Sequence, residues 1–336
     1  MTTYDTYKPT GIDWLGEIPA GWRAVALKYV VETKITDGPH ETPEFVEEGV
    51  PFVSAEAVKE GRINFNYRRG NIKPDVDALY AKKCKPKRGD IFIVKSGSTT
   101  GKIALVDFDD DFNIWSPLAL VRVKPEHSSA FIFYALSSEY FQKNIQLSWS
   151  FGTQPNIGMN VLENLRVVLP GEGEQTAIAA YLDDKTAKID TLIDRKRRLI
   201  DLLREEKATL INEAVTKGIN PDVPMKPSGI EWLGDIPAHW NLKKLRYVVL
   251  KVGSGVTPSG GASVYKTEGI PLLRSQNIHF DGLRLDDVAY ITEEVDESMR
   301  NSRVQAGDVL INITGASIGR CYFIPDGFGP GKEAAR

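Results

Sequence analysis

The pattern of apolar and polar positions first predicts short buried strands. Residues 90–94 and 118–123 are short runs of mostly apolar side chains, and residues 308–313 and 321–324 follow the same pattern. Runs of this length between turn residues are typical of strands. Residues 131–145 instead place apolar side chains at helical spacing and predict one amphipathic helix. The chain therefore predicts domains of mixed α and β structure.

A second pattern is much longer and predicts a single helix over residues 171–217. This stretch contains no proline, and Gly218 and Pro221 supply stop signals directly after it. Successive positions of one face are separated alternately by three and four residues, which is the spacing of a heptad seam. The seam, which two lysines interrupt, consists of Thr186, Ile189, Ile193, Lys196, Ile200, Leu203, Lys207, Leu210 and Ala214.

The length of this helix bears on its role. At 1.5 Å per residue it forms a rod of roughly 65–70 Å, which is too long to be buried in a small core. A heptad seam needs a partner helix, and a solvated connector is the alternative. For the partner-helix contact we single out seven apolar residues of this stretch: Ile178, Leu182, Ile189, Ile193, Ile200, Leu203 and Leu210.

An internal repeat divides the chain. Residues 8–30 and 226–248 are identical at 14 of 23 positions, at an offset of 218 residues. Weaker correspondences follow in the same order, and they join residues 50–53 to 270–273, 89–93 to 307–311 and 97–102 to 315–320. A period this long indicates a duplicated domain, because solenoid repeats are only about 20–50 residues long. The chain therefore presents two related modules.

Composition excludes several classes of protein. The 42% hydrophobic and 26% charged content is typical of a globular protein, and 336 residues suggest two or three domains. No run of 18 or more apolar residues exists, and the first residues lack the features of a signal peptide, so we expect a cytoplasmic protein without a membrane span. Two cysteines and four scattered histidines predict neither a disulfide framework nor a metal site.

Residues 97–102, GSTTGK, are the main candidate for nucleotide chemistry. They have one residue too few between their glycines for a phosphate-binding loop, and Ile103 stands where such a loop has serine or threonine. We interpret the segment as a tight turn whose backbone N–H groups and Lys102, or Arg320 in the second copy, approach a nucleic-acid phosphate. A purely structural turn between two strands is the alternative.

Other catalytic signatures are weak. Glu205, Glu206 and Lys207 have the spacing of some nuclease motifs, but they lie inside the predicted long helix, where a solvated face is the simpler interpretation. No glycine-rich dinucleotide motif opens a strand-to-helix turn. The sequence therefore predicts a non-catalytic chain without a cofactor or metal of its own.

Local charge differs from the net charge of −3. Between residues 59 and 102, a stretch that we call the basic segment, twelve basic residues face four acidic ones, a balance of +8, and Phe65, Tyr67 and Tyr80 lie among them. Such a stretch is typical of a surface that follows a phosphate backbone. Residues 243–320 of the second module are nearly balanced, with ten basic and nine acidic residues. Residues 195–198 of the long helix are also basic, but a solvated face is the better interpretation there.

Four motifs resemble type I restriction–modification specificity (S) subunits. Residues 169–183, LPGEGEQTAIAAYLD, and 189–193, IDTLI, are similar to the signature that opens the conserved helix of that family. The doubled motif KP(T/S)GI(D/E)WLG(E/D)IP and residues 152–158, GTQPNIG, are similar to further motifs of the same subunits. The resemblance spans nearly the whole chain, and its motifs follow in the family's order.

The resemblance implies an α+β fold with two mixed α/β target recognition domains, each of which reads one half of a split double-stranded DNA sequence. A long coiled-coil helix after each domain would set the gap between the half-sites. The subunit would have no catalytic site of its own. It would dock modification subunits, which bind S-adenosylmethionine and methylate adenine, and restriction subunits with motor activity, which use ATP, would join for cleavage.

The expected domains are an N-terminal arm (1–21), a first recognition domain (22–170), the spacer helix (171–217), a linker with the repeat motif (218–240) and a second recognition domain (241–336). A second copy as long as the first would extend about 100 residues beyond Arg336. We therefore expect the second domain to be incomplete and the helix to lack its intramolecular partner. On this expectation the chain self-associates through Ile189, Ile193, Ile200 and Leu203.

For DNA contact we single out three groups in the first module and one in the second. The glycine loop (residues 95–102) supplies Lys95, Ser96, Ser98, Thr99 and Lys102. The basic segment supplies Arg68, Arg69, Lys82, Lys83, Lys85, Lys87 and Arg88, and the pre-helix loop (residues 152–158) supplies Thr153, Gln154 and Asn156. The second module supplies Arg274, Ser275, Gln276, Asn277, Thr314, Ser317 and Arg320.

Two other functions stay open. A truncated or silent fragment could bind the modification subunit as a structural or regulatory protein without reading DNA. An enzyme that uses a nucleoside triphosphate is the remote third option.

Overall fold

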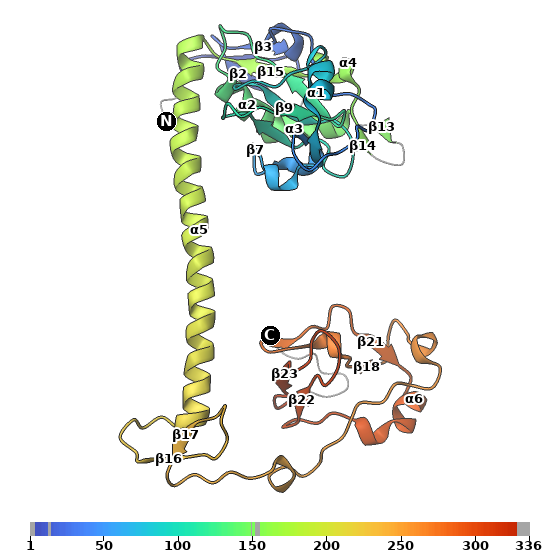
Figure 1. Ribbon diagram of the computed structural model, residues 1–336. Helices are drawn as coiled ribbons and strands as arrows, with labels where there is room; N and C mark the ends of the chain where they lie inside the picture. The colour runs from blue at the N-terminus through green and yellow to red at the C-terminus, as the bar shows by residue number, and fades with distance from the viewer. Residues whose placement is uncertain (1–3, 13–14, 149, 152–154, 328–336) are drawn as a thin grey trace. The chain divides into compact units, whose positions relative to one another are not determined.

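The computed structural model describes residues 4–12, 15–148, 150–151 and 155–327. The chain folds into two compact units, Met1–Ala208 and Thr209–Arg336. Helix α5 (Glu172–Lys217) begins in the first unit and is one uninterrupted helix of 46 residues (Figure 1). The predicted long helix over residues 171–217 is therefore confirmed, as is the mixed α and β character of both modules. No helix among the described residues is both long and apolar enough to cross a membrane.

The main sheet of the first unit has four antiparallel strands in the order β10–β9–β12–β4. Its strands are β10 (Ile103–Leu105), β9 (Ile91–Val94), β12 (Leu118–Val121) and β4 (Thr36–Asp37). Every residue of β9 and β12 is buried, because apolar side chains cover both faces of this sheet. The predicted strands over 90–94 and 118–123 are confirmed, with slightly narrower bounds.

Smaller strands and helices surround this sheet in the first unit. A three-stranded sheet has the order β11–β5–β8, and the other strands form pairs. These strands are β1 (Tyr7–Pro9), β2 (Glu17–Pro19), β3 (Arg23–Ala26), β5 (Val50–Val53), β6 (Val58–Lys59), β7 (Arg62–Ile63), β8 (Gly70–Ile72), β11 (Asn113–Ile114), β13 (Ser150–Phe151), β14 (Pro155–Asn156) and β15 (Arg166–Leu169). The helices are α1 (Pro74–Ala81), α2 (Ser129–Ser137), α3 (Glu139–Leu147) and α4 (Met159–Asn164), with 3-10 helices at Leu27–Tyr29, Ala55–Ala57 and Phe65–Tyr67.

The single helix predicted over residues 131–145 is wrong, because two helices occupy this region. Ser138, between α2 and α3, has an extended backbone with φ −66° and ψ 150°. Serine is a frequent residue at the start of a helix, where it favours a non-helical backbone. Apolar side chains of both helices, such as Ile132 and Ile145, are nevertheless fully buried in the same core. The apolar spacing therefore predicted the buried side chains correctly. Because it continues across Ser138, it did not predict the break between the two helices.

Two apolar cores lie on the two faces of the main sheet. Ile91 and Ile93 contribute to one core, and Phe92 and Val94 contribute to the other, as the alternation of side chains along a strand requires. The first core also contains α2, α3 and Ala179 at the start of α5. The long helix is thus packed into the first unit at its beginning.

The described residues of the second unit repeat part of the arrangement of the first, as strand pairs. Its strands are β16 (Met225–Pro227), β17 (Asp235–Pro237), β18 (Ile270–Leu272), β19 (Ile278–His279), β20 (Gly282–Leu283), β21 (Ala289–Ile291), β22 (Val309–Ile311) and β23 (Cys321–Phe323). It also contains α6 (Glu293–Ser298) and 3-10 helices at Leu245–Tyr247, Gly261–Val264, Ser275–Asn277 and Arg300–Ser302. The hairpin β16–β17 and the pair β22–β23 lie 218 residues after β1–β2 and β9–β10. The predicted strands over 308–313 and 321–324 are confirmed with narrower bounds.

Candidate nucleic-acid interface

The glycine loop is a tight turn that joins β9 to β10. Gly97 and Gly101 have φ angles of 99° and 92°, which lie in the region that favours glycine. The backbone N–H groups of Thr100 and Lys102 donate to Gly97 O and Thr99 O, each at 3.1 Å. A phosphate-binding loop of the nucleotide type leads from a strand into a helix, whereas this turn leads into a second strand. The geometry therefore does not support a nucleoside triphosphate site here.

The same turn occurs in the second unit. Asn312 N–H donates to Arg320 O at 2.8 Å, as Val94 N–H donates to Lys102 O at 2.8 Å in the first. Gly319 N–H donates to Asn312 O at 2.8 Å, which is the counterpart of the bond from Gly101 to Val94. The backbone of this loop is thus held in the same way in both units, although most of its side chains differ.

The glycine loop lies against the pre-helix loop in the first unit. Gly97 N–H donates to Pro155 O at 3.1 Å, and Ile157 N–H donates to Lys95 O at 2.8 Å. The hydroxyl of Thr100 also reaches Pro155 O, at 3.1 Å. Two loops that are more than fifty residues apart in the sequence therefore form one surface at the end of β9.

Several predicted DNA-contact residues meet on this surface. Ser96 and Asn156 form an isolated antiparallel bridge between the two loops. Ser98 and Lys102 have exposed side chains, and Thr99 is half-buried. Thr153 and Gln154 lie outside the described residues.

Lys95 has a different environment from Lys102. Its ammonium group lies 3.0 Å from Asp37, and only 13% of its side chain is exposed. Asp37 also accepts a hydrogen bond from Lys83 at 2.6 Å and lies 3.2 Å from His40. Burial alone would raise the pKa of Asp37, but its hydrogen bonds to Lys83 and Lys95 lower that pKa below its ordinary value. Asp37 thus fixes the side chain that begins the glycine loop.

Acidic residues pair with much of the basic segment. Arg69 forms an ion pair with Glu56 and lies 5.1 Å from the ring centroid of Trp115. Lys85 lies 2.8 Å from Asp77 and 2.7 Å from Asp111, and Arg88 lies 2.7 Å from Asp109. Most of these acidic partners lie outside residues 59–102, so a balance counted along the sequence overstates the positive charge of the folded surface.

The basic segment is also divided between the two ends of β9. Lys87 and Arg88 precede this strand, whereas Lys95 and the glycine loop follow it. Lys82, Lys87 and Arg68 are exposed, and the guanidinium of Arg68 donates to Asn71 and to Phe65 O. The predicted stripe is therefore not one continuous patch at the glycine loop.

The candidates of the second unit gather around Asn312. This buried amide donates to Ser275 O at 2.7 Å and to the hydroxyl of Ser317 at 3.0 Å. The 3-10 helix Ser275–Asn277, with exposed Gln276 and buried Asn277, thus lies beside the second glycine loop. Arg274 lies 5.6 Å from the ring centroid of Tyr265, Arg320 is half-buried, and Thr314 is exposed.

Sequence reasoning missed Asp37, Trp115 and Asn312. Asp37 lies far from Lys83 and Lys95 in the sequence, and only the pairing of β4 with β12 places it beside them. Asn312 carries a better signal, because it lies within the predicted strand over 308–313, at the position that Val94 occupies in the first copy. A polar residue at a position that is apolar in the other copy of a repeat indicates that its side chain makes a specific contact there.

The start of α5 is fixed to the first unit by several contacts. Gln175 is buried, donates to Pro170 O at 3.0 Å and accepts from Ser128 N–H at 3.2 Å. The indole N–H of Trp22 donates to Glu174 at 3.0 Å. Of the predicted partner-helix residues, Ile178 and Leu182 are half-buried on this side.

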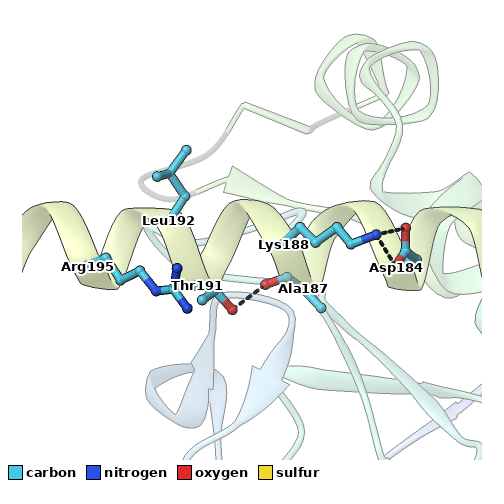
Figure 2. A pocket seen from close by; sticks show the side chains of 6 residues that line it. All are labelled: Asp184, Ala187, Lys188, Thr191, Leu192 and Arg195. Carbon is cyan, nitrogen blue, oxygen red and sulfur yellow. Dashed lines mark hydrogen bonds and ion pairs between the residues drawn. The ribbon is translucent and has the colours of Figure 1, made fainter.

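The remaining partner-helix residues are exposed. They are Ile189, Ile193, Ile200, Leu203 and Leu210. Beside them, a hollow of about 430 Å³ follows the surface of α5 (Figure 2), and it is lined by Asp184, Ala187, Lys188, Thr191, Leu192 and Arg195. Figure 2 shows that four of these residues bind one another within the helix, since Lys188 lies 2.7 Å from Asp184 and Thr191 donates to Ala187 O at 2.8 Å.

Metal-binding side chains and a buried thiol are the remaining candidates for chemistry among the described residues. They contain no group of three or more histidine, cysteine, aspartate or glutamate side chains that could hold a metal ion. Burial raises the pKa of the Cys84 thiol to about 12, so this residue is protonated at neutral pH. What the surface offers is a pair of polar loops suited to contact with a larger ligand.

We expect acid to weaken the first unit through Asp37. Because the folded-state pKa of Asp37 lies below its ordinary value of 3.8, the ionised group stabilises the fold at every pH above that value. This contribution is lost as the pH falls below about 4 and through the folded-state pKa. Asp37→Asn should lower the free energy of unfolding by about 1–3 kcal/mol at pH 7. The difference between the two proteins should shrink toward pH 3 in urea titrations; a constant difference would contradict the assignment.

Comparison with known proteins places these observations in context. The family model described as the type I restriction modification DNA specificity domain matches residues 19–200. The specificity subunit of the type I restriction enzyme MjaVIII from Methanocaldococcus jannaschii is 30% identical over 208 residues, which are 60% of this chain and 47% of that protein. The EcoBI specificity subunit of Escherichia coli is 25% identical over 234 residues, which are 64% of this chain and 48% of that protein.

A solved structure is also similar. The crystal structure of the HsdS subunit from Thermoanaerobacter tengcongensis is 22% identical, covers 63% of this chain and 48% of its own, and superimposes with a TM-score of 0.41. The chain spans about half the length of the curated relatives it matches.

Proposed function

Because the chain belongs to the type I restriction modification DNA specificity family, we propose that it is a non-catalytic subunit that reads one half of a bipartite double-stranded DNA sequence. The observation that carries this proposal is the junction of the glycine loop and the pre-helix loop at one end of β9. It gathers hydroxyl, amide and ammonium groups on a backbone that hydrogen bonds hold in place.

The side chains of this junction suit different parts of a duplex. The hydroxyl of Ser98 and the amide of Asn156 can read base edges, since Ser and Asn bind donor and acceptor groups in the major groove. Lys102 is exposed and suits a phosphate, which fixes register. Lys95 is a positioning residue in this proposal, because its charge is bound to Asp37. In the second unit, Gln276 and Ser317 are the corresponding candidates for base contact.

We further propose that α5 docks partner helices. At about 100° per residue, Tyr181, Leu192 and Leu199 lie beside the seam and widen the apolar face to roughly 120°. Such a face is broader than the two positions per heptad that a two-stranded coiled coil uses. The width of this face supports contact with two helices. One helix would lie along the seam and would come from a conserved helix or from a second copy of this chain. The other would lie beside the seam and would come from a modification subunit. In this arrangement S-adenosylmethionine and ATP are bound by the modification and restriction subunits of a cytoplasmic complex.

The glycine loop can be tested through Lys102. Lys102→Ala should weaken DNA binding of the assembled complex by a similar factor for specific and non-specific duplexes, because a phosphate contact is independent of sequence. The slope of log affinity against log salt should fall by about one. Fluorescence anisotropy with labelled duplexes over a range of salt concentrations measures both effects.

Two variants accompany this test. Arg88→Ala removes an exposed cation at the other end of β9, where it pairs with Asp109, and should leave affinity and slope unchanged. Lys95→Ala should lower affinity with little change of slope, because the lost charge is already bound to Asp37. Unchanged affinity in both the Lys95 and the Lys102 variants would refute the glycine-loop assignment. Assembly with the modification subunit without binding to any duplex would favour a structural or regulatory role instead.

A further inference from the structure

Three side chains from three separate elements meet just after strand β5 of the first unit. Glu56 lies in the 3-10 helix that follows this strand. Arg69 lies directly before β8, and its N–H donates to Phe52 O at 2.9 Å. Trp115 directly follows β11, and its N–H donates to Val53 O, also at 2.9 Å. Because β5 lies between β11 and β8 in its sheet, these bonds hold Trp115 and Arg69 on the two sides of its end.

The three side chains of this group, which we call the arginine cluster, are fixed to one another. The guanidinium of Arg69 forms an ion pair with Glu56 and lies 5.1 Å from the ring centroid of Trp115, a distance at which a cation is attracted to an aromatic ring. The Trp115 ring lies near fully buried Phe52, with ring centroids 6.4 Å apart. An arginine held in this way has already lost much of the side-chain freedom that binding a ligand costs.

The arginine cluster is accessible, and it lies beside the glycine loop. The side chains of Arg69 and Glu56 are 44% and 47% exposed. Two residues after Trp115, the carbonyl oxygen of Pro117 accepts a hydrogen bond at 2.8 Å from the N–H of Lys95, which begins the glycine loop. A duplex that lies on the glycine loop therefore has the cluster within its reach.

The second unit contains the same kind of group after the corresponding strand. Arg274 follows β18, the counterpart of β5, and lies 5.6 Å from the ring centroid of Tyr265 and 3.8 Å from the carboxylate of Asp287. In the repeat, Arg274 corresponds to Ser54 and Tyr265 to Phe45. The two units thus bring an arginine, an aromatic ring and a carboxylate together from different positions. This favours a role for the group itself over a requirement of the shared fold.

The charges of the arginine cluster suit a base pair better than a phosphate. Glu56 would repel a phosphate that approached Arg69. In the major groove, guanine presents the acceptors O6 and N7, which an arginine binds with two N–H groups, and the paired cytosine presents an N4 amino donor, which a carboxylate accepts. A guanidinium has enough N–H groups to bind a carboxylate and a base edge together. An arginine beside a glutamate therefore complements both bases of one G·C pair.

We propose that the arginine cluster determines specificity for one G·C base pair of the half-site. Arg69 donates to O6 and N7 of the guanine, and Glu56 accepts from N4 of the cytosine. Trp115 is a positioning residue that keeps the guanidinium in place. This inference rests on the proposed function, because it requires that the first unit bind duplex DNA. The charge pattern of the sequence placed Arg69 on a surface that follows phosphates, whereas here it reads a base.

Selection by the assembled complex from a library of duplexes with random sequence tests this proposal. Sequencing of the duplexes bound by the unchanged complex should show guanine at one position of the half-site. Arg69→Ala should lower the preference for guanine at that position at least about tenfold and leave the other positions unchanged, because the lost contact reads one base pair. Glu56→Ala should raise the affinity for non-specific duplexes, because the unpaired guanidinium then attracts phosphates.

Arg62→Ala is the matched control. Arg62 is an arginine of the same segment, its guanidinium lies 4.0 Å from Asp107, and 77% of its side chain is exposed. This variant should select the same sequences as the unchanged complex. Circular dichroism should give the same spectrum for all four proteins.

Three outcomes would overturn the inference alone: sequence selection by the unchanged complex without guanine at any position, the same selection by the Arg69→Ala complex, or an even loss of affinity for all sequences in that variant. The last outcome would assign Arg69 to a phosphate. If the unchanged complex binds no duplex at all, the proposed function fails and this inference fails with it, so the two failures are distinguishable.

Discussion

Asp90→Ala is expected to destabilise the first unit by about 2–4 kcal/mol, because it leaves a partly buried guanidinium without its partner. Asp90 is fully buried and accepts two hydrogen bonds from Arg122, at 2.8 and 2.7 Å. These hydrogen bonds raise the pKa of Arg122. Asp90 also accepts a bond from Lys87 N–H at 2.8 Å, which holds the turn that begins β9. A loss of this size is a large share of the stability of an ordinary domain.

Hydrogen exchange of β9 and β12 in increasing urea measures this loss within the full chain. The matched control is Asp109→Ala, which removes an exposed carboxylate from its pair with Arg88 and should change stability by less than about 0.5 kcal/mol. If the two variants lose the same stability, the buried pair does not have the assigned role. The second unit should be unaffected by either variant.

The double variant Ile193→Glu/Ile200→Glu is expected to reduce association through α5 at least about a hundredfold, which corresponds to about 2.7 kcal/mol. Both side chains are exposed on the seam, and a partner helix would bury them. Placing two glutamates in that contact leaves charges without partners in an apolar surface. Analytical ultracentrifugation of the chain, alone and with the modification subunit, measures both associations.

Leu202→Glu is the control for this variant. Leu202 is also exposed on α5, but at about 100° per residue it lies away from the seam. The Leu202→Glu chain should have an association constant within a few-fold of that of the unchanged chain. Circular dichroism should give the same helix content for the unchanged chain, the double variant and the Leu202→Glu variant. Association that is equally strong in the double variant would refute the seam as an interface.

Local sequence patterns predicted the strands and helices of this fold well. They predicted the distribution of charge on its surface less well. The buried strands around Ile91 and Leu118 were predicted from short apolar runs. A strand that is buried on both faces is apolar at successive positions, so a few residues of sequence are enough to predict it. The break at Ser138 was missed because the apolar spacing continues across it. The repeat predicted β22–β23 and the second glycine loop from their counterparts in the first copy.

The candidate interface depends on contacts between residues that lie far apart in the sequence, and local patterns do not predict such contacts. Lys95 has the residue type of a phosphate ligand, but the pairing of β4 with β12 brings Asp37 to its side chain. Lys85 is likewise bound to Asp77 and Asp111. Asp37 and Asp111 lie outside residues 59–102, so a charge count over that segment leaves them out. The count therefore predicted a continuous stripe where the structure has separate ion pairs.

The backbone bonds of the glycine loop have a consequence for how such a protein can change over generations. The path of the turn depends on Gly97 and Gly101 and on main-chain groups that every residue possesses. Side chains at positions 96, 98 and 99 can therefore be exchanged by mutation without rebuilding the turn. The two copies already differ in this way, since GSTTGK and GASIGR share one backbone. A surface of this kind can acquire new preferences by single substitutions while its scaffold is inherited unchanged.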